Sequence, residues 1–269
     1  MSDTEPKYME ISQVEIEKHL DGLLNLIDEA GAAIMAVYGT DFTVDIKDDD
    51  SPLTDADRRS HEIMVPALEA MLGIPVISEE DGKDKAERTK EVLRTARAYV
   101  VVDPLDGTRE FRDRSGQFCP GFAVIVDGRP YFGMYSVPTQ GVTYYGGPSM
   151  GSFKKEGDGV PVRLRVATES TGKVLGSRID TGGPSGAYVK EKYARHEIIS
   201  IGSMMKFGLI AEGKADAYPS IDRPLKLWDL APGHAIVEGA GGIVTRPDGS
   251  PIDYRNTTLL AGDFVARAA

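Results

Sequence analysis

Two aspartates that follow a strongly apolar segment are the residues of this sequence best suited to carry chemistry. Residues 100–108 read V-V-V-D-P-L-D-G-T, so Asp103 and Asp106 lie three positions apart across a Pro-Leu turn. The apolar run predicts a strand buried on both faces, which would deliver Asp103 to its carboxyl end, where open α/β sheets bind ligands. The backbone carbonyl of Leu105 lies between the two carboxylates. Mg²⁺ prefers such all-oxygen sets, so this segment predicts a metal site.

The two residues after Asp106 indicate that the same site binds a phosphate. Gly107 permits close approach of a ligand to the backbone, and the amides of Gly107 and Thr108 would begin a helix. The start of a helix is a ready anion site, because its first N–H groups have no partner within the helix. The alternative is an acidic turn that binds no ligand. That alternative does not explain why a buried strand, paired aspartates and a glycine occur together.

Three further segments place carboxylates where they could join this site. Glu79 and Glu80 directly follow a short predicted strand. Asp229, in W-D-L-A-P-G, and Asp57, in S-P-L-T-D-A-D, each fall at the predicted start of a helix. Each segment alone has an ordinary interpretation, because acidic strand ends are commonly solvated and an acid at a helix start complements the helix dipole. Their meaning depends on whether the fold brings them together.

The elements that must position these residues follow from hydrophobic periodicity. Helices are predicted over 16–37, over 55–72, from Ser203 onward and from near Trp228 onward, and 83–97 reads as a solvated helix or loop. Strands are predicted over 42–46, 74–78, 99–102, 122–126, 131–135, 142–145, 151–155, 163–166, 173–175 and 198–201. A capping box at Ser12 and Glu15 would start the first helix, and Pro66 would kink or split the second.

This mixture of helices, hairpins and strands predicts an α/β protein of layered sheets and helices. A glycine- and proline-rich stretch near 182–186 indicates a boundary. We therefore expect an N-terminal α/β metal-binding portion over 1–182 and a C-terminal α/β portion over 183–269 that completes the active site.

Composition excludes several classes of function. The chain has 269 residues, a formal net charge of −11 and a pI of about 4.9, which argues against a nucleic-acid polymer as partner. Its single cysteine, Cys119, forms no internal disulfide and fits a reducing cytoplasm. The polar N-terminus is no secretory signal, and no apolar run reaches the roughly 18 residues of a membrane span. An acidic protein that binds an anion needs local cations, which bound metal ions would supply.

The acidic segments, taken in order, resemble the inositol monophosphatase superfamily of Mg²⁺-dependent, lithium-sensitive phosphatases. The resemblance rests on E-E, D-P-L-D-G-T and W-D-x-A-x-G in this order and spans most of the chain. It implies an αβαβα sandwich that hydrolyses a small phosphate monoester with two or three Mg²⁺ ions. In such a site the ions activate a water nucleophile and stabilise the leaving oxygen.

Carried over residue by residue, the resemblance implies the metal ligands and a catalytic pair. The metal ligands would be Glu79, Asp103, the carbonyl of Leu105, Asp106 and Asp229. Glu80 would be an acid just outside these ligands. Asp57 and Thr108 would polarise the attacking water, and Gly107 with Thr108 would contact the substrate.

Within the superfamily, the sequences of three segments are most similar to those of the bacterial 3′(2′),5′-bisphosphate nucleotidases. These segments are S-P-L-T-x-A-D, D-P-L-D-G-T-R-E-F and I-G-S-x-x-K-F. The resemblance implies conversion of 3′-phosphoadenosine 5′-phosphate to AMP and phosphate, with Ser203 and Lys206 near the substrate. Ser203 is also a good helix N-cap, which alone would explain it. The oligomeric state is not predicted, and a homodimer stays open.

The chain departs from those relatives at two positions, and other functions therefore stay open. Asp180 stands where they commonly carry His, and Ser220 where many carry Arg, with Arg223 as a candidate substitute. An inositol-phosphate or other sugar-phosphate phosphatase is the first alternative, and a catalytically silent protein that binds a phosphorylated ligand is the second. The G-x-S-x-G motif around Ser149 would mark a serine hydrolase only if a helix followed it, and residues 152–155 predict a strand.

Overall fold

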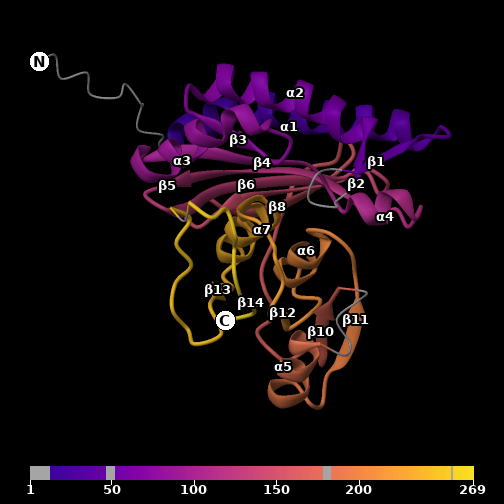
Figure 1. Cartoon of the computed structure of the whole chain (residues 1–269). Helices are drawn as coiled ribbons and strands as arrows, with labels where there is room; N and C mark the ends of the chain where they lie inside the picture. Colours follow the sequence, from indigo (N-terminus) through magenta and orange to yellow (C-terminus); the bar gives the residue numbers. More distant parts are fainter. Residues whose placement is uncertain (1–12, 47–51, 178–182, 256) are drawn as a thin grey trace, which may run out of the picture.

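Helices and sheets alternate in the computed structural model, which describes residues 13–46, 52–177, 183–255 and 257–269 (Figure 1). The helices are α1 (Gln13–Tyr38), α2 (Asp55–Leu72), the 3-10 helix η1 (Lys83–Lys85), α3 (Ala86–Thr95), α4 (Thr108–Arg112), α5 (Pro184–Lys192), α6 (Met205–Ala211) and α7 (Leu227–Gly239). The strands are β1 (Val44–Ile46), β2 (Pro52–Thr54), β3 (Val76–Ser78), β4 (Ala98–Asp106), β5 (Cys119–Val126), β6 (Arg129–Val137), β7 (Val142–Gly147), β8 (Gly151–Glu156), β9 (Val162–Arg163), β10 (Lys173–Gly176), β11 (Glu197–Ser200), β12 (Ala217–Ser220), β13 (Ile243–Thr245) and β14 (Phe264–Arg267).

These elements stack as α-β-α-β-α layers. A seven-stranded sheet, in the order β3-β4-β5-β6-β7-β8-β9, carries α1 and α2 on one face and α7 on the other. α6 packs on α7, and both contact a five-stranded sheet in the order β11-β10-β12-β14-β13. α5 packs against β12 and forms the last layer (Figure 1). The layering is the one that the sequence predicted.

Strand β4 is buried on both faces, as its apolar run predicts. Successive side chains of a strand point to opposite faces. Val100 therefore joins the core under α1 and α2, where it meets Leu23 and Leu68, while Val101 joins the core on the α7 side. Both valines are fully buried. The apolar sequence of β4 thus fixes its aspartates in the middle of the molecule.

Helix α2 begins where the sequence predicts and then continues through its proline. Thr54 and Asp57 form a capping box at its start, and Gly73, in the left-handed region, ends it. A proline inside a helix removes one backbone hydrogen bond and costs about 3 kcal/mol. Pro66 nevertheless does not split the helix, so the expectation of a split was wrong, while the expected kink stays a prediction. Burial of its neighbours, Val65 among them, offsets the cost.

Strand β4 is longer than predicted, and its end is irregular. Asp103 pairs with Gly121 of β5, but Asp106, three residues on, pairs with Cys119, only two residues back along β5. The extra residue on β4 is a bulge, and bulges redirect side chains next to active sites. The pattern of residues 103–106 predicted a turn here. The structure instead keeps both aspartates on the strand and uses the bulge to change their direction.

The predicted division at residue 182 stays a prediction. The residues at the boundary, 178–182, and the proposed capping residue Ser12 lie outside the described residues. The larger apolar core contains residues from both portions, such as Val101 of β4 and Phe207 of α6. Within the described part of the chain, every helix is too short or too polar to cross a membrane.

Candidate active site

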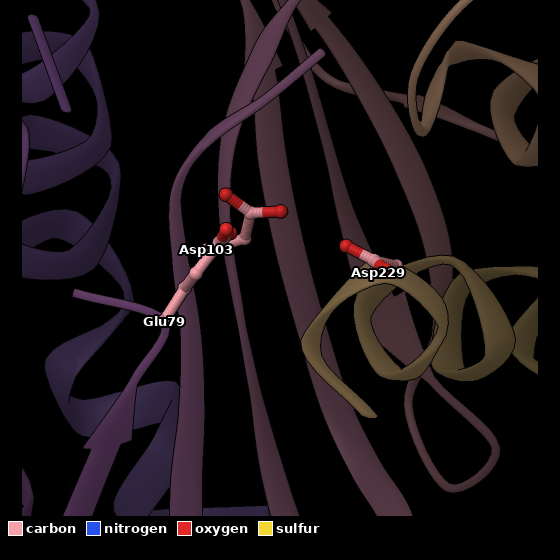
Figure 2. Close-up of side chains that lie close together, drawn as sticks. All are labelled: Glu79, Asp103 and Asp229. Atoms are coloured by element: carbon pink, nitrogen blue, oxygen red, sulfur yellow. The ribbon is translucent and has the colours of Figure 1, made fainter. Parts of the chain in front are cut away.

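Three carboxylates from three elements meet at one end of the seven-stranded sheet. Glu79 follows β3, Asp103 lies in the parallel neighbour β4, and Asp229 lies in the first turn of α7. One oxygen of each lies within 4.8 Å of the others. Figure 2 shows Glu79 and Asp103 on the sheet side, with Asp229 facing them from its helix. Among the residues that the structure describes, no other group of three His, Cys, Asp or Glu side chains is arranged to hold a metal ion.

Backbone hydrogen bonds hold these carboxylates in place. The amide of Leu105 donates to Asp103 Oδ1 (3.0 Å), and the amide of Lys226 donates to Asp229 Oδ2 (2.7 Å). The amide of Glu79 donates to the carbonyl of Val102 (3.1 Å), which joins the ends of β3 and β4. The backbone therefore orients the carboxylates of Asp103 and Asp229, and the pairing of β3 with β4 fixes the backbone of Glu79.

The cluster is electrostatically costly without a cation. Burial raises the pKa of Asp103 well above its usual range, and the charge of Glu79 raises it further. Burial and then the charge of Glu79 also raise the pKa of Asp229, to about 7. Crowded, buried carboxylates resist ionisation unless an opposite charge lies beside them. A divalent cation would supply that charge.

The donors present fit a hard cation. Every side chain in the cluster offers carboxylate oxygen, and neither a histidine nor a thiolate belongs to it. Oxygen donors of this kind suit Mg²⁺ and Ca²⁺, whereas imidazole and thiolate suit zinc and copper. The metal site that the sequence predicted at Asp103 therefore agrees with the chemistry of the donors gathered there.

A second group, Asp57 and Thr108, lies next to the carbonyl of Leu105. The Thr108 hydroxyl lies 3.4 Å from Asp57 Oδ1 and 3.2 Å from the Leu105 oxygen, and it can donate to either. The amide and hydroxyl of Thr54 donate to Asp57 Oδ2 at 2.7 and 2.6 Å. Asp57 thus caps α2 and faces Thr108 at the same time. The predicted pair is brought together across 51 residues of sequence.

A polar cavity of about 190 Å³ opens beside the carboxylates. Asp106, Gly107 and Asp229 are among the residues that line it. Gly107 has a φ of +90°, and a Cβ there would lie 2.8 Å from the carbonyl oxygen of Gln117, so only glycine fits. A ligand in this cavity would reach both the acids and the start of α4.

Ser203 lies in the cavity wall, but it is not the N-cap of α6. Its φ is +52°, in the left-handed region, and Met204 takes the cap position. Its hydroxyl lies 3.3 Å from the sulfur of Cys119 and 3.5 Å from the amide nitrogen of Met205, which donates to it. The expectation of a simple cap was wrong, since Ser203 precedes the cap position and its backbone is left-handed. A non-glycine residue with positive φ is strained, and such strain is often found at functional sites.

Lys206 also lines the cavity, from α6. It is 4% exposed, and its ammonium donates to the carbonyls of Ser203 (2.7 Å) and Ile201 (3.1 Å). It lies 4.9 Å from the centre of the Tyr218 ring. An ammonium has three protons, so one remains for a ligand. Lys206 consequently holds the loop before α6 and faces the cavity with the same group.

The remaining sequence-predicted residues have different positions. Asp106 is not part of the three-carboxylate cluster. Burial and the charge of Asp229 nevertheless raise the pKa of Asp106, so Asp106 interacts electrostatically with the cluster. Glu80 is half-buried, and its amide donates to the Ser78 hydroxyl (3.3 Å). Ser220 is buried in β12 and does not line the cavity. Asp180 lies outside the described residues.

Two residues near the site were missed by reasoning from the sequence. The side chain of Gln117, in the segment between α4 and β5, accepts a hydrogen bond from the amide of Gly202 (2.7 Å), which joins this segment to the loop before α6. Arg109 lines the cavity from the α4 side. Arg109 lies inside a recognised motif, but its direction depends on α4. Gln117 carries no local signal.

The serine hydrolase alternative at Ser149 fails, because strand β8 follows it directly.

Comparison with known proteins identifies the family. The model of the "Inositol monophosphatase family" matches residues 15–268. This chain belongs to the inositol monophosphatase family. Family members are metal-dependent phosphatases, which confirms the predicted enzyme class. The 3′(2′),5′-bisphosphate nucleotidase CysQ of Escherichia coli K12 is 37% identical over 238 residues, which is 87% of this chain and 93% of that protein. CysQ of Buchnera aphidicola is 34% identical over 240 residues, or 88% of each chain.

Solved structures of the family share the fold. A crystal structure of CysQ from Bacteroides thetaiotaomicron superposes with a TM-score of 0.80 at 32% identity, and the match covers 95% of this chain and 99% of that one. An inositol monophosphatase from Zymomonas mobilis superposes with a TM-score of 0.73 at 23% identity over 96% of this chain and 94% of that one, which shows the common fold. The αβαβα sandwich expected from the sequence is confirmed.

Proposed function

We propose that this protein is a Mg²⁺-dependent 3′(2′),5′-bisphosphate nucleotidase that converts 3′-phosphoadenosine 5′-phosphate to AMP and inorganic phosphate. The observation that carries the proposal is the cluster of Glu79, Asp103 and Asp229, with Asp103 buried and Asp229 lining a polar cavity, in a chain 37% identical to CysQ. The cluster supplies a site for hydrolysis, and the relatives supply the class of substrate.

The carboxylates would hold two or three Mg²⁺ ions. Glu79, Asp103 and Asp229 provide the central donors, and Asp106 with the Leu105 carbonyl extends the set toward the cavity. Bound there, the ions would neutralise the phosphate and lower the pKa of a water nucleophile. The cluster would also orient the substrate, because a phosphate bound at the metal ions must lie next to Asp229.

Asp57 and Thr108 would take the proton from the attacking water. Asp57 is held by two hydrogen bonds from Thr54, which stabilise its carboxylate form. Thr108 can give its hydroxyl proton to Asp57, and its oxygen can then accept a proton from water. The water oxygen forms the new bond to phosphorus, the ester bond breaks, and the leaving oxygen of the ribose takes up a proton. No covalent phosphoenzyme forms.

The cavity would hold the rest of the nucleotide. Gly107 and Thr108 begin α4 beside the cluster, and their amides would contact the reacting phosphate. Ser203 and Lys206 also line the cavity and would contact the part of the substrate that is not hydrolysed. A bisphosphate needs such a division, with one phosphate at the metals and separate contacts for the other.

The test is phosphate release from 3′-phosphoadenosine 5′-phosphate with Mg²⁺, with the nucleotide product identified by chromatography. We expect AMP as the product, with activity that disappears on chelation, returns with Mg²⁺ and is poorly supported by Ca²⁺, whose looser coordination would misplace the phosphate. Asp103→Asn is the matched inactive control, since it removes one charge without creating a cavity. Full turnover after exhaustive chelation would refute the metal mechanism, and adenosine 3′-monophosphate as the product would refute the proposed choice of phosphate.

A further inference from the structure

The α4 side of the cavity is rich in carboxylates. Asp106, Glu110 and Asp113 line it, and Arg109 is the one cation that α4 and the end of β4 contribute to the cavity within the described residues. Asp113 is paired with Arg112 (3.0 Å), but Asp106 and Glu110 still repel a phosphate. Arg109 is the cation on this side that can offset the repulsion for a second phosphate group.

The other two cations that line the cavity, Lys206 and Arg223, are engaged with the protein. Lys206 donates to the carbonyls of Ile201 and Ser203, and a guanidinium nitrogen of Arg223 donates to the Ser177 hydroxyl. These bonds position the loops around the cavity. They also reduce the number of donors that either side chain can offer to a ligand.

Arg109 differs from both of these cations. Its side chain is exposed at the cavity edge, and it makes no hydrogen bond or ion pair with any residue that the structure describes. A guanidinium presents five N–H donors in a planar fork that matches a phosphate in two-point contact. Arg109 also follows Thr108 directly, so its backbone lies about 3.8 Å from that of a proposed catalytic residue. The distance between the Arg109 backbone and the site of hydrolysis is therefore fixed.

We propose that Arg109 binds the phosphate that is not hydrolysed and thereby selects a bisphosphate over a monophosphate. This inference rests on the proposed function, because only a substrate with two phosphates would use it. Glu110 contributes to the selection, since its carboxylate disfavours an anion placed on the α4 side away from the guanidinium.

The experiment compares two substrates that differ only in the second phosphate: 3′-phosphoadenosine 5′-phosphate and adenosine 3′-monophosphate. Arg109→Ala should raise KM for the bisphosphate about tenfold, as expected for one charge-assisted contact at a partly solvated site. KM for the monophosphate should change much less. Arg109→Lys should recover part of the loss, because it keeps the charge but not the two-point geometry.

Arg112→Ala is the matched control. Arg112 belongs to the same helix, is exposed, pairs with Asp113 (3.0 Å) and does not line the cavity. If general charge were responsible, Arg112→Ala and Arg109→Ala would raise KM for the bisphosphate equally, and that result would contradict the inference. An Arg109→Ala enzyme whose two KM values change by the same factor would also contradict it, with the proposed function intact. A wild-type enzyme that does not hydrolyse the bisphosphate would overturn the proposed function together with this inference.

Discussion

Replacement of Asp229 by asparagine should stabilise the metal-free protein and abolish its response to Mg²⁺. Burial and the nearby Glu79 raise the pKa of Asp229 from 3.8 to about 7. Between these two values the folded protein binds a proton that the unfolded chain does not. The ionisation of Asp229 therefore does not destabilise the metal-free fold below about pH 4. It lowers the free energy of unfolding progressively as the pH rises to 7. Asparagine removes the charge and keeps the shape.

The size of the effect follows from the same shift. A change of about 3 pKa units corresponds to roughly 4 kcal/mol as an upper limit at pH 8. Asparagine also lacks the negative charge that is favourable at the start of α7, and this lowers the gain in stability by up to about 1 kcal/mol. The hydrogen bond from the Lys226 amide survives, because the asparagine oxygen also accepts. Coupling among the acids reduces the gain further, and we expect a net of about 2 kcal/mol, or a rise in Tm of about 4 °C.

The assay is thermal unfolding at pH 8 in a chelator and again in Mg²⁺. Wild type should gain stability with Mg²⁺, since a ligand that binds only the folded state stabilises it, whereas Asp229→Asn should gain little. Asp55→Asn is the control, because Asp55 also lies in the first turn of a helix but is exposed and paired with Arg58. It should be unchanged or slightly less stable. An Asp229→Asn protein that melts below wild type in the chelator, or gains as much from Mg²⁺, would refute the reasoning.

Three further predictions concern other parts of the site. Thr108→Ala and Asp57→Asn should each lower kcat about 100-fold while the Mg²⁺-induced rise in Tm remains, and a trapped phosphoenzyme would contradict their role. Lys206→Ala should raise KM for the bisphosphate and also lower Tm in the absence of substrate, because Lys206 holds two loop carbonyls; an unchanged Tm would contradict that second role. Burial raises the pKa of the Cys119 thiol, so Ellman's reagent should label it only as fast as the protein unfolds, and rapid labelling of the native protein would count against its burial.

The parts of the fold that were predictable from the sequence depend on local patterns. The apolar run before Asp103 requires a buried strand whatever surrounds it, and Thr54 with Asp57 forms a capping box from side chains three positions apart. Glu79 directly follows a strand, and Asp57 and Asp229 lie in the first turn of a helix, as predicted. These inferences needed no knowledge of distant contacts, whereas Asp103 was expected at the end of its strand and lies three residues before it.

The parts that were not predictable depend on contacts between distant segments. The bulge that separates Asp103 from Asp106 arises from the register with β5. The left-handed conformation of Ser203 accompanies its contact with Cys119, 84 residues away, and it overrides the preference of serine for a helix cap. Gln117 meets Gly202 across 85 residues. No periodicity or motif carries such information.

The most direct test of the central claim is the ratio of kcat/KM for 3′-phosphoadenosine 5′-phosphate to that for inositol 1-phosphate, measured with the same Mg²⁺-saturated enzyme. Both compounds carry a phosphate that the carboxylate cluster could hydrolyse, but only the first has a second phosphate for the cavity. We predict a ratio well above one, on the order of tenfold or more for a single additional charge-assisted contact. A ratio below one, with inositol 1-phosphate turned over more efficiently, would contradict the proposed function.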